Sequence, residues 1–456
     1  MTGARGTLHL LLAAAALAIG STPAQAQFVG REREAKMPAA GPILPLRERA
    51  RLQDRWLKTR LDTLAPALMR EHGFDMWVLI AREYLEDPVL ATMLDAENMH
   101  ARRRTILIFF DPGGGKPVER LTVSRYGLGG LFEPAWEPEK QPDQWKRLGE
   151  LIAERNPKRI AVNSSSATAF ADGLTHSQYQ GLLAALPKPL RGRVTATDDL
   201  AVEWLATRTA EEMAVYPDIV RTAHSIIAEA LSDKVITPGK TTSEDVVWWM
   251  RERTQALGLK AWFQPSLGIL RQGVKGMLEG NEVIRKGDML WTDFGFTYLR
   301  LNTDTQHLGY VLKDGERDAP RGLKAGLAAA NAVQDALTAQ FKVGRTGNEV
   351  LALARRAALE RGLKPTIYTH PIGHHGHGAG PNIGFWDNQG PSPSGERPLR
   401  ANTAFSIELN AKVAVPEWGG QEVEFRSEED AFFDGEKVRY LDGRQQEFHL
   451  VGKHRD

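Results

Sequence analysis

Residues 286–304 have the sequence Lys-Gly-Asp-Met-Leu-Trp-Thr-Asp-Phe-Gly-Phe-Thr-Tyr-Leu-Arg-Leu-Asn-Thr-Asp. The apolar part of this stretch predicts a strand over residues 288–294, with Asp293 near its end and a glycine directly after it. Asp304 follows eleven residues later, beyond an expected turn around residues 298–301. A hairpin of this length can bring the two carboxylates together, and acidic groups at close range need a cation between them.

Residues 371–381 form an unusual loop, Pro-Ile-Gly-His-His-Gly-His-Gly-Ala-Gly-Pro. Three of the chain's twelve histidines fall within four residues of this loop, embedded in glycine. Neutral imidazole is a common ligand for divalent transition metals, so the loop is a candidate metal-binding segment. A surface loop with incidental histidines is the alternative interpretation.

Two further carboxylates stand in apolar surroundings downstream of this loop. Glu408 lies inside the run Phe-Ser-Ile-Glu-Leu, and Glu428 follows Arg426 and Ser427 in a later strand-like run. An unpaired charge in such an environment is costly, so each carboxylate needs a partner. A metal ion would supply that partner, and an ordinary salt bridge to Arg426 or Arg444 is the alternative.

The rest of the chain divides into two parts of different character. Short β-branched and aromatic runs alternate with helical stretches in the first part and predict strands at 75–81, 105–110, 119–124 and 158–162. The second part predicts an amphipathic helix at 209–233, helices after the capping boxes at 242–245 and 346–349, and strands at 302–311, 403–414 and 422–433. We therefore expect an α/β domain over residues 51–205, followed by an α+β domain over residues 206–456.

Composition excludes several classes of protein. Hydrophobic residues make up 42% of the 456 residues and charged residues 25%, as in an ordinary globular protein. The formal net charge of +1 gives no electrostatic basis for a nucleic-acid partner. The chain has no cysteine, so disulfides, thiolate nucleophiles and cysteine-ligated metals are excluded.

The N-terminus has the pattern of a secretory signal peptide over residues 1–26. Its apolar run from Leu10 to Ile19 is too short to span a bilayer, and it is followed by Ala24-Gln-Ala26 at the expected cleavage site. Residues 27–50, rich in polar residues and proline, are expected to form a mobile leader. The sequence thus predicts a periplasmic or secreted protein with no stable membrane span.

The order of these motifs resembles that of the M24 metallopeptidases, the pita-bread family of Xaa-Pro aminopeptidases, prolidases and methionine aminopeptidases. Flanking features agree, including Ile236-Thr-Pro-Gly239 and the Lys286-Gly-Asp288 that precedes the first carboxylate. The α/β first half resembles the creatinase-type N-terminal domain of that family. The resemblance implies an α+β pita-bread catalytic domain after the α/β N-terminal domain.

The resemblance also implies five metal ligands: Asp293, Asp304, His377, Glu408 and Glu428. By this resemblance Asp293 would be a bidentate ligand of one metal, and Asp304 and Glu428 would bridge both metals. His377 and Glu408 would complete the second metal, and Glu408 would also be the catalytic proton shuttle. Two alternatives remain open. His375 competes with His377, and Glu429 competes with Glu428.

Four carboxylates and one imidazole favour two divalent ions, with Mn²⁺ expected first and Co²⁺ or Zn²⁺ as alternatives. A hydroxide bridging two such ions would attack the peptide carbonyl, and Glu408 would pass a proton to the leaving nitrogen. The expected substrate is a peptide or another small molecule, most plausibly a peptide whose N-terminal residue precedes proline, cleaved by an aminopeptidase or a dipeptidase. A homodimer is one oligomeric state that the sequence allows.

Three positions depart from the family's usual pattern. No histidine stands between Gln264 and Asp293, Gly384 occupies the place of a second histidine, and Gln306 stands where the family commonly has arginine. These departures keep two other hypotheses open. One is an M24-fold hydrolase of another small amide or ester, and the other is a catalytically silent binding protein of this fold.

Overall fold

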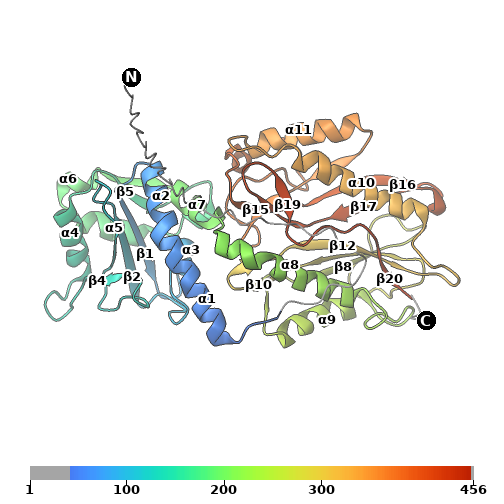
Figure 1. Cartoon of the computed structure of the whole chain (residues 1–456), viewed down its shortest axis with the longest axis horizontal. Coiled ribbons are helices and arrows are strands. Elements are labelled where there is room, and N and C mark those ends of the chain that lie inside the picture. The colour runs from blue at the N-terminus through green and yellow to red at the C-terminus, as the bar shows by residue number, and fades with distance from the viewer. Residues whose placement is uncertain (1–41, 453–456) are drawn as a thin grey trace, which may run out of the picture.

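The computed structural model describes residues 42–452, which form two domains connected at the start of a long helix (Figure 1). The expected signal peptide and residues 27–41 of the expected leader lie outside the described residues. Helix α1 begins at Leu46, so residues 46–50 belong to this helix and not to a leader. The boundary expected between residues 205 and 206 lies one residue before the end of α7, at Ala206.

The N-terminal domain is a six-stranded mixed sheet with helices on both faces (Figure 1). The strand order is β4-β3-β2-β1-β5-β6, in which β1 pairs antiparallel with β2 and parallel with β5. The strands are β1 (Met76–Arg82), β2 (Arg104–Phe110), β3 (Glu119–Thr122), β4 (Glu133–Pro134), β5 (Ile160–Asn163) and β6 (Val194–Thr197). The helices are α1 (Leu46–Thr59), α2 (Ala65–Glu71), α3 (Pro88–Thr92), α4 (Gln144–Arg155), α5 (His176–Ala185), α6 (Lys188–Arg191) and α7 (Asp199–Ala206). These elements confirm the predicted α/β class.

Both faces of this sheet are buried, which explains why its central strands are continuously apolar. Trp77 and Leu79 of β1 enter the core beneath α1, α2 and α7. Val78 and Ile80, the alternate residues, enter a second core beneath α4 and α5. The period of two in a strand thus distributes one apolar run between two cores.

The C-terminal domain places its strands between two pairs of helices, with α8 and α9 on one side and α10 and α11 on the other (Figure 1). Its helices are α8 (Ala210–Ala230), α9 (Ser243–Ala256), α10 (Arg321–Thr338) and α11 (Gly347–Glu360). Its strands up to residue 311 are β7 (Lys260–Ala261), β8 (Ser266–Leu270), β9 (Met289–Phe294), β10 (Phe296–Tyr298), β11 (Leu301–Asn302) and β12 (Thr305–Val311). Its later strands are β13 (Pro365–Ile367), β14 (His370–Ile372), β15 (Thr403–Ser406), β16 (Leu409–Val415), β17 (Gln421–Ser427), β18 (Asp430–Phe433), β19 (Val438–Tyr440) and β20 (His449–Val451).

Three of these helices begin in complete capping boxes. Thr242 and Thr346 cap α9 and α11, as the sequence predicts, and Thr209 caps α8 in the same way. In each box the threonine hydroxyl accepts from the backbone of the third helical residue, whose carboxylate accepts from the threonine backbone. None of the helices in residues 42–452 is both long enough and apolar enough to cross a bilayer.

The strands β9 and β12 divide the C-terminal domain into two cores. Met289 and Trp291 of β9 pack with α10 and α11, whereas Leu290 and Phe294 pack with α8 and α9. Alternation therefore places Asp293 on the face that carries Met289 and Trp291. On β12 the same alternation separates the neighbouring side chains at 306 and 307 onto opposite faces.

Two long runs that the sequence predicts as single strands are each broken at a carboxylate. Residues 403–414 divide into β15 and β16 around Glu408, and residues 422–433 divide into β17 and β18 around Glu428. The four pieces pair across the breaks, β15 with β18 and β16 with β17. The breaks therefore bring Glu408 and Glu428 to the same level of the domain.

Replacing Gly295 with alanine is expected to lower the free energy of unfolding by roughly 1–3 kcal/mol, as overpacking of a tight site does. A Cβ at this position would lie 2.1 Å from the carbonyl oxygen of Thr303 and 2.6 Å from Nε1 of Trp262. Chemical denaturation would measure the effect. Gly192→Ala is the control, because a Cβ there meets no atom within 4 Å. Equal stability of the two variants would contradict the close approach.

Candidate metal centre

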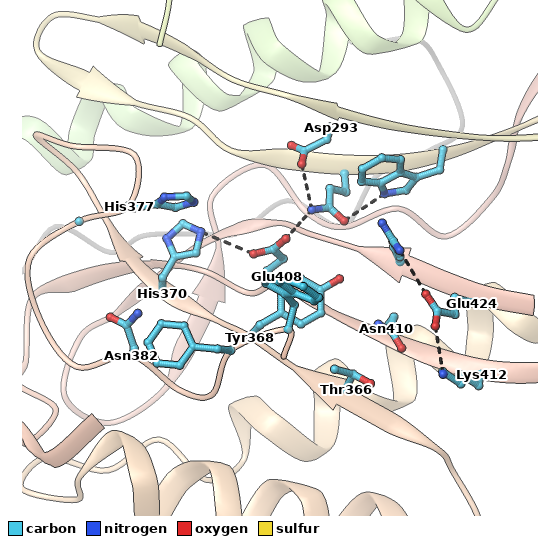
Figure 2. Close-up of a pocket in the computed structure, with 16 residues that line it drawn as sticks. Asp293, Thr366, Tyr368, His370, His377, Asn382, Glu408, Asn410, Lys412 and Glu424 are labelled. Atoms are coloured by element: carbon cyan, nitrogen blue, oxygen red, sulfur yellow. Dashed lines mark hydrogen bonds and ion pairs between the residues drawn. The ribbon is translucent and has the colours of Figure 1, made fainter. Parts of the chain in front are cut away.

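Four carboxylates and one histidine converge beside a cavity of about 840 Å³ in the C-terminal domain. Asp293, Glu408 and His370 line this cavity (Figure 2). Ligand atoms of Asp293, Asp304 and Glu428 lie within 4.8 Å of one another. Those of His370, Glu408 and Glu428 form a second such group, which shares Glu428 with the first. The fold thus brings together Asp293, Asp304, Glu408 and Glu428, and the fifth side chain that the resemblance names, His377, lies in a third such group with Asp304 and His370.

Asp293 is held in place by its partner on the neighbouring strand. Gln306 of β12 lies directly opposite Asp293 of β9, and its Nε2 donates to Asp293 Oδ2 at 3.3 Å. The same Nε2 donates to Glu408 Oε1 at 2.5 Å, while Gln306 Oε1 accepts from Trp291 Nε1 at 3.0 Å. One amide therefore orients two of the acidic side chains. The sequence marked Gln306 only as a departure from the family pattern, because its contacts depend on strand pairing.

Glu428 is fixed by β12 and by β15. Its backbone exchanges hydrogen bonds with Gln306, at 3.1 and 3.3 Å, across an isolated antiparallel bridge. Its Oε1 accepts from the Ser406 hydroxyl at 2.6 Å. Asp304 is also fixed through its backbone, which donates to Asp430 Oδ2 at 3.1 Å. Ser406 and Asp430 are supporting residues that sequence reasoning did not identify.

His370, the first residue of β14, is the histidine that faces the carboxylates. Its Nε2 lies 3.5 Å from Glu428 Oε1 and 3.7 Å from both Asp304 Oδ2 and Glu408 Oε2. Its Nδ1 lies 3.0 Å from the carbonyl oxygen of Pro371. A proton on Nδ1 donates to that carbonyl and leaves the Nε2 lone pair directed at the carboxylates.

The histidines of the glycine-rich loop lie at different distances from this centre. His377 is exposed and borders the cavity, grouped with Asp304 and His370 (Figure 2). His375 stacks on Phe170 of the N-terminal domain, with ring centroids 4.2 Å apart. His374 Nδ1 lies 3.3 Å from the carbonyl oxygen of Arg300. Of these three loop histidines, only His377 lies beside the carboxylates.

Glu429, the alternative to Glu428, points elsewhere. Its carboxylate contacts His224 and His307, and these contacts lie on the α8 side of β12. Of the two adjacent glutamates, Glu428 is the one that lies with Asp293 and Asp304 in the candidate metal centre.

Burial and mutual repulsion dominate the electrostatics of the centre. Burial, and next the charge of Glu428, raise the pKa values of Asp293, Asp304 and Glu408 well above their usual range. Burial raises the pKa of Glu428 to about 8. Burial also lowers the pKa of His370 to about 4, so its imidazole is neutral at pH 7. A neutral imidazole among crowded carboxylates is a suitable donor set for divalent cations.

Three buried polar atoms of the centre lack hydrogen bonds to the described residues and are suitable metal ligands. Asp293 Oδ1, His370 Nε2 and Glu428 Oε2 are buried and have no hydrogen-bond partner among residues 42–452. Buried polar atoms without partners are rare and require an explanation. Cations of charge +2 would pair with all three atoms and would offset the repulsion among the carboxylates. The residues present therefore fit a metal centre.

Metal-free protein is expected to lose stability as the pH rises from about 5 to about 8. The pKa of Glu428 is about 8 in the folded chain and about 4.5 when unfolded, so the folded state binds more protons in this interval. Its stabilising contribution is complete below the unfolded pKa and is lost as the pH rises through the folded pKa. At about 1.4 kcal/mol per pKa unit, the loss is on the order of 3–5 kcal/mol.

Urea denaturation of chelated protein at pH 5 and pH 8 would measure this loss. Glu428→Gln is the matched control, because it removes the titrating group while keeping its shape, and its pH dependence should be flatter. Added Mn²⁺ should restore most stability at pH 8. A chelated wild type as stable at pH 8 as at pH 5, relative to this control, would contradict the expectation.

Comparisons with known proteins agree with this geometry. The model of metallopeptidase family M24 matches residues 218–427, which contain Asp293, Asp304, His370 and Glu408. The chain is similar in fold to an X-Pro aminopeptidase from Thermotoga maritima MSB8, with 18% sequence identity and a TM-score of 0.61, over 84% of this chain and 100% of that one. No curated protein matches the chain in the sequence search.

Two further solved structures show the same fold. An Xaa-Pro dipeptidase from Bacillus anthracis is 17% identical, with a TM-score of 0.55, and covers 89% of this chain and 100% of its own. The prolidase from Pyrococcus horikoshii OT3 is 14% identical, with a TM-score of 0.53, over 88% and 99% of the two chains. These alignments span both domains and confirm the predicted architecture. Residues 218–427, which lie in the C-terminal domain, therefore belong to metallopeptidase family M24.

Proposed function

We propose that this chain is an exported, dinuclear metal-dependent peptidase that cleaves after an N-terminal residue followed by proline. The observation that carries the proposal is the convergence of four carboxylates, two of them buried, with His370 beside one cavity. The printed names of the structural neighbours, which are X-Pro aminopeptidases and Xaa-Pro dipeptidases, support the choice of substrate.

Five side chains would hold the metals: Asp293, Asp304, His370, Glu408 and Glu428. When bound, two divalent ions, with Mn²⁺ expected first, lower the pKa of a water molecule and polarise the scissile carbonyl. His377, which the sequence resemblance selects as the histidine ligand, borders the same cavity and remains the alternative to His370.

The chain's own residues supply orientation and proton transfer. Glu408 lines the cavity, and burial together with the charge of Glu428 raises its pKa well above the usual range. A carboxyl group of raised pKa can carry a proton to a leaving nitrogen near neutral pH. Gln306 holds Glu408 toward Asp293 during this transfer.

The cavity is large enough for a short peptide and has aromatic walls. Trp291, Phe385 and Trp386 line it, and the Trp386 side chain is 76% exposed. Apolar rings of this kind exclude water and pack against a proline ring.

The test is a substrate comparison with the chain from Gln27 onward, loaded with Mn²⁺ and desalted. We expect hydrolysis of Ala-Pro-Ala and of Ala-Pro, and rates at least about 100-fold lower for Ala-Ala-Ala and Ala-Ala. The ratio of the tripeptide and dipeptide rates would separate an aminopeptidase from a dipeptidase. Elemental mass spectrometry on the same sample should find about two ions per chain.

Other outcomes would overturn parts of the proposal. If the protein bound ions and cleaved other amides or esters but no peptide, the metal centre would stand and the proposed peptide substrate would be wrong. Neither bound ions nor hydrolysis would favour a silent binding protein of this fold. Asp293→Asn is the control for contaminating peptidases, because residual activity in that variant would not come from the metal centre.

Export is tested on the full chain. Expression with its own N-terminus in a Gram-negative host should yield a periplasmic or secreted protein whose first residue is Gln27. A protein that keeps residues 1–26 and stays in the cytoplasm would contradict this part.

A further inference from the structure

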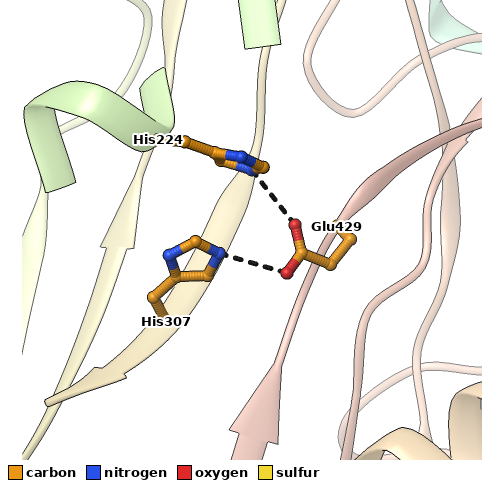
Figure 3. A group of neighbouring side chains, drawn as sticks. All are labelled: His224, His307 and Glu429. Atoms are coloured by element: carbon orange, nitrogen blue, oxygen red, sulfur yellow. Dashed lines mark hydrogen bonds and ion pairs between the residues drawn. The ribbon is translucent and has the colours of Figure 1, made fainter. Parts of the chain in front are cut away.

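Behind the cavity, on the α8 face of the sheet, lies a second group of metal-ligating side chains (Figure 3). It consists of His224 from α8, His307 from β12 and Glu429 from the break between β17 and β18. Each of these residues is at most 5% exposed. Within residues 42–452 this is one of the groups whose ligand atoms all lie within 4.8 Å of one another.

The ligand atoms of this group point at one another. Nε2 of His224 lies 3.1 Å from Glu429 Oε2, and Nε2 of His307 lies 3.1 Å from Glu429 Oε1. Ligands bound to a tetrahedral metal at about 2.0–2.1 Å are about 3.3 Å apart, so the spacing suits a shared ion. His224 Nε2 and Glu429 Oε2 are buried, and within residues 42–452 neither atom has a hydrogen bond beyond their mutual ion pair. An ion between them would give each atom a further partner in a dry interior.

With a metal bound, the outer partners would hold both imidazoles in the metal-binding tautomer. Nδ1 of His224 lies 2.8 Å from Asp442 Oδ2, and Nδ1 of His307 lies 3.1 Å from Nε2 of His449. A proton on each Nδ1 donates to these acceptors and leaves both Nε2 lone pairs free for a metal. A carboxylate–histidine pair such as Asp442 and His224 is a usual support of a histidine ligand.

We propose that His224, His307 and Glu429 form a second, structural metal site for one Zn²⁺ ion, separate from the catalytic centre. Two imidazoles and one carboxylate are an established zinc donor set. The ion's charge of +2 would be balanced by Glu429 and Asp442. This proposal goes beyond the proposed peptidase activity and does not depend on it.

The site is distinct from the cavity because of strand alternation. Gln306 and His307 are neighbours on β12 and project to opposite faces, as do Glu428 and Glu429 in the extended chain between β17 and β18. Gln306 contacts Glu408 and Glu428 contacts His370, both in the candidate metal centre, whereas His307 and Glu429 contact each other in the second site. A bound ion would therefore join α8 to the back of the strands that carry the catalytic ligands.

The test compares two variants, each of which removes one of the two carboxylates that contact His224. Glu429→Gln removes a proposed ligand, whereas Asp442→Asn removes a supporting partner of the same imidazole. We expect the full chain, expressed with zinc and desalted, to lose about one zinc per chain in Glu429→Gln and to lose less in Asp442→Asn, whose amide oxygen still accepts from His224 Nδ1. Equal zinc content in the wild type and both variants would overturn the proposal, because an ion-paired cluster needs no metal.

A measurement on the wild type guards against a variant that fails to fold. Crystals of the zinc-supplied protein should give an anomalous-scattering peak at the zinc edge between His224, His307 and Glu429. Peaks only at the cavity would overturn this inference while leaving the peptidase proposal standing. A peak only between His224, His307 and Glu429, with no peptide hydrolysis, would support this inference and overturn the peptidase proposal.

Discussion

Replacing Asp293 with asparagine is expected to lower kcat/KM for an Xaa-Pro peptide by about 1000-fold or more. Asp293 is buried beside Asp304 and Glu428, and its Oδ1 has no hydrogen-bond partner within the described chain. Asparagine keeps the shape but removes the charge and one oxygen ligand, so the ion that depends on this carboxylate is lost. Chemistry that requires a polarised carbonyl and an activated water is lost with it.

Steady-state kinetics and elemental mass spectrometry on one preparation would check this expectation. Asp314→Asn is the matched control, since Asp314 has a side chain that is 90% exposed and pairs with Lys286 at the surface. Its activity and metal content should equal those of the wild type. If Asp293→Asn kept full activity and full metal loading, every hydrolytic hypothesis for this cavity would fail.

Replacing His370 with glutamine is expected to lower kcat/KM by about 100-fold or more and to reduce the metal content. His377→Gln should cost about 10-fold or less and leave both ions bound. The physical reason is their placement. His370 Nε2 is buried within 3.7 Å of three carboxylates, whereas His377 is exposed at the edge of the cavity. A ligand removed from a metal costs more than a side chain that touches substrate at the rim.

The same two variants distinguish the structural assignment from the sequence-based one. Motif resemblance selects His377, because the spacing Gly-His-Gly-x-Gly surrounds it. If His377→Gln lost an ion and His370→Gln did not, the sequence-based choice would be correct. Thermal unfolding of both variants would show whether either loss follows from misfolding.

Most of the secondary structure could be predicted from local patterns. The strands over 75–81 and 105–110 are observed as β1 and β2, and the capping boxes at Thr242 and Thr346 start α9 and α11. Such features depend on neighbours within a few residues, so the sequence contains them directly. The breaks within 403–414 and 422–433 could not be predicted, because neither run contains a glycine or proline that would mark an interruption.

The sequence by itself determined the fold class, the order of the acidic motifs and the exclusion of cysteine chemistry, because these follow from composition and local periodicity. Tertiary structure decided which histidine faces the carboxylates. It placed His370 there through the pairing of β14 with β15, opposite Ser406. It also gave Gln306 and His307 separate roles on opposite faces of one strand, and it gathered His224, His307 and Glu429 from three distant segments. Contacts of this kind depend on strand register and packing, which no short window of sequence contains.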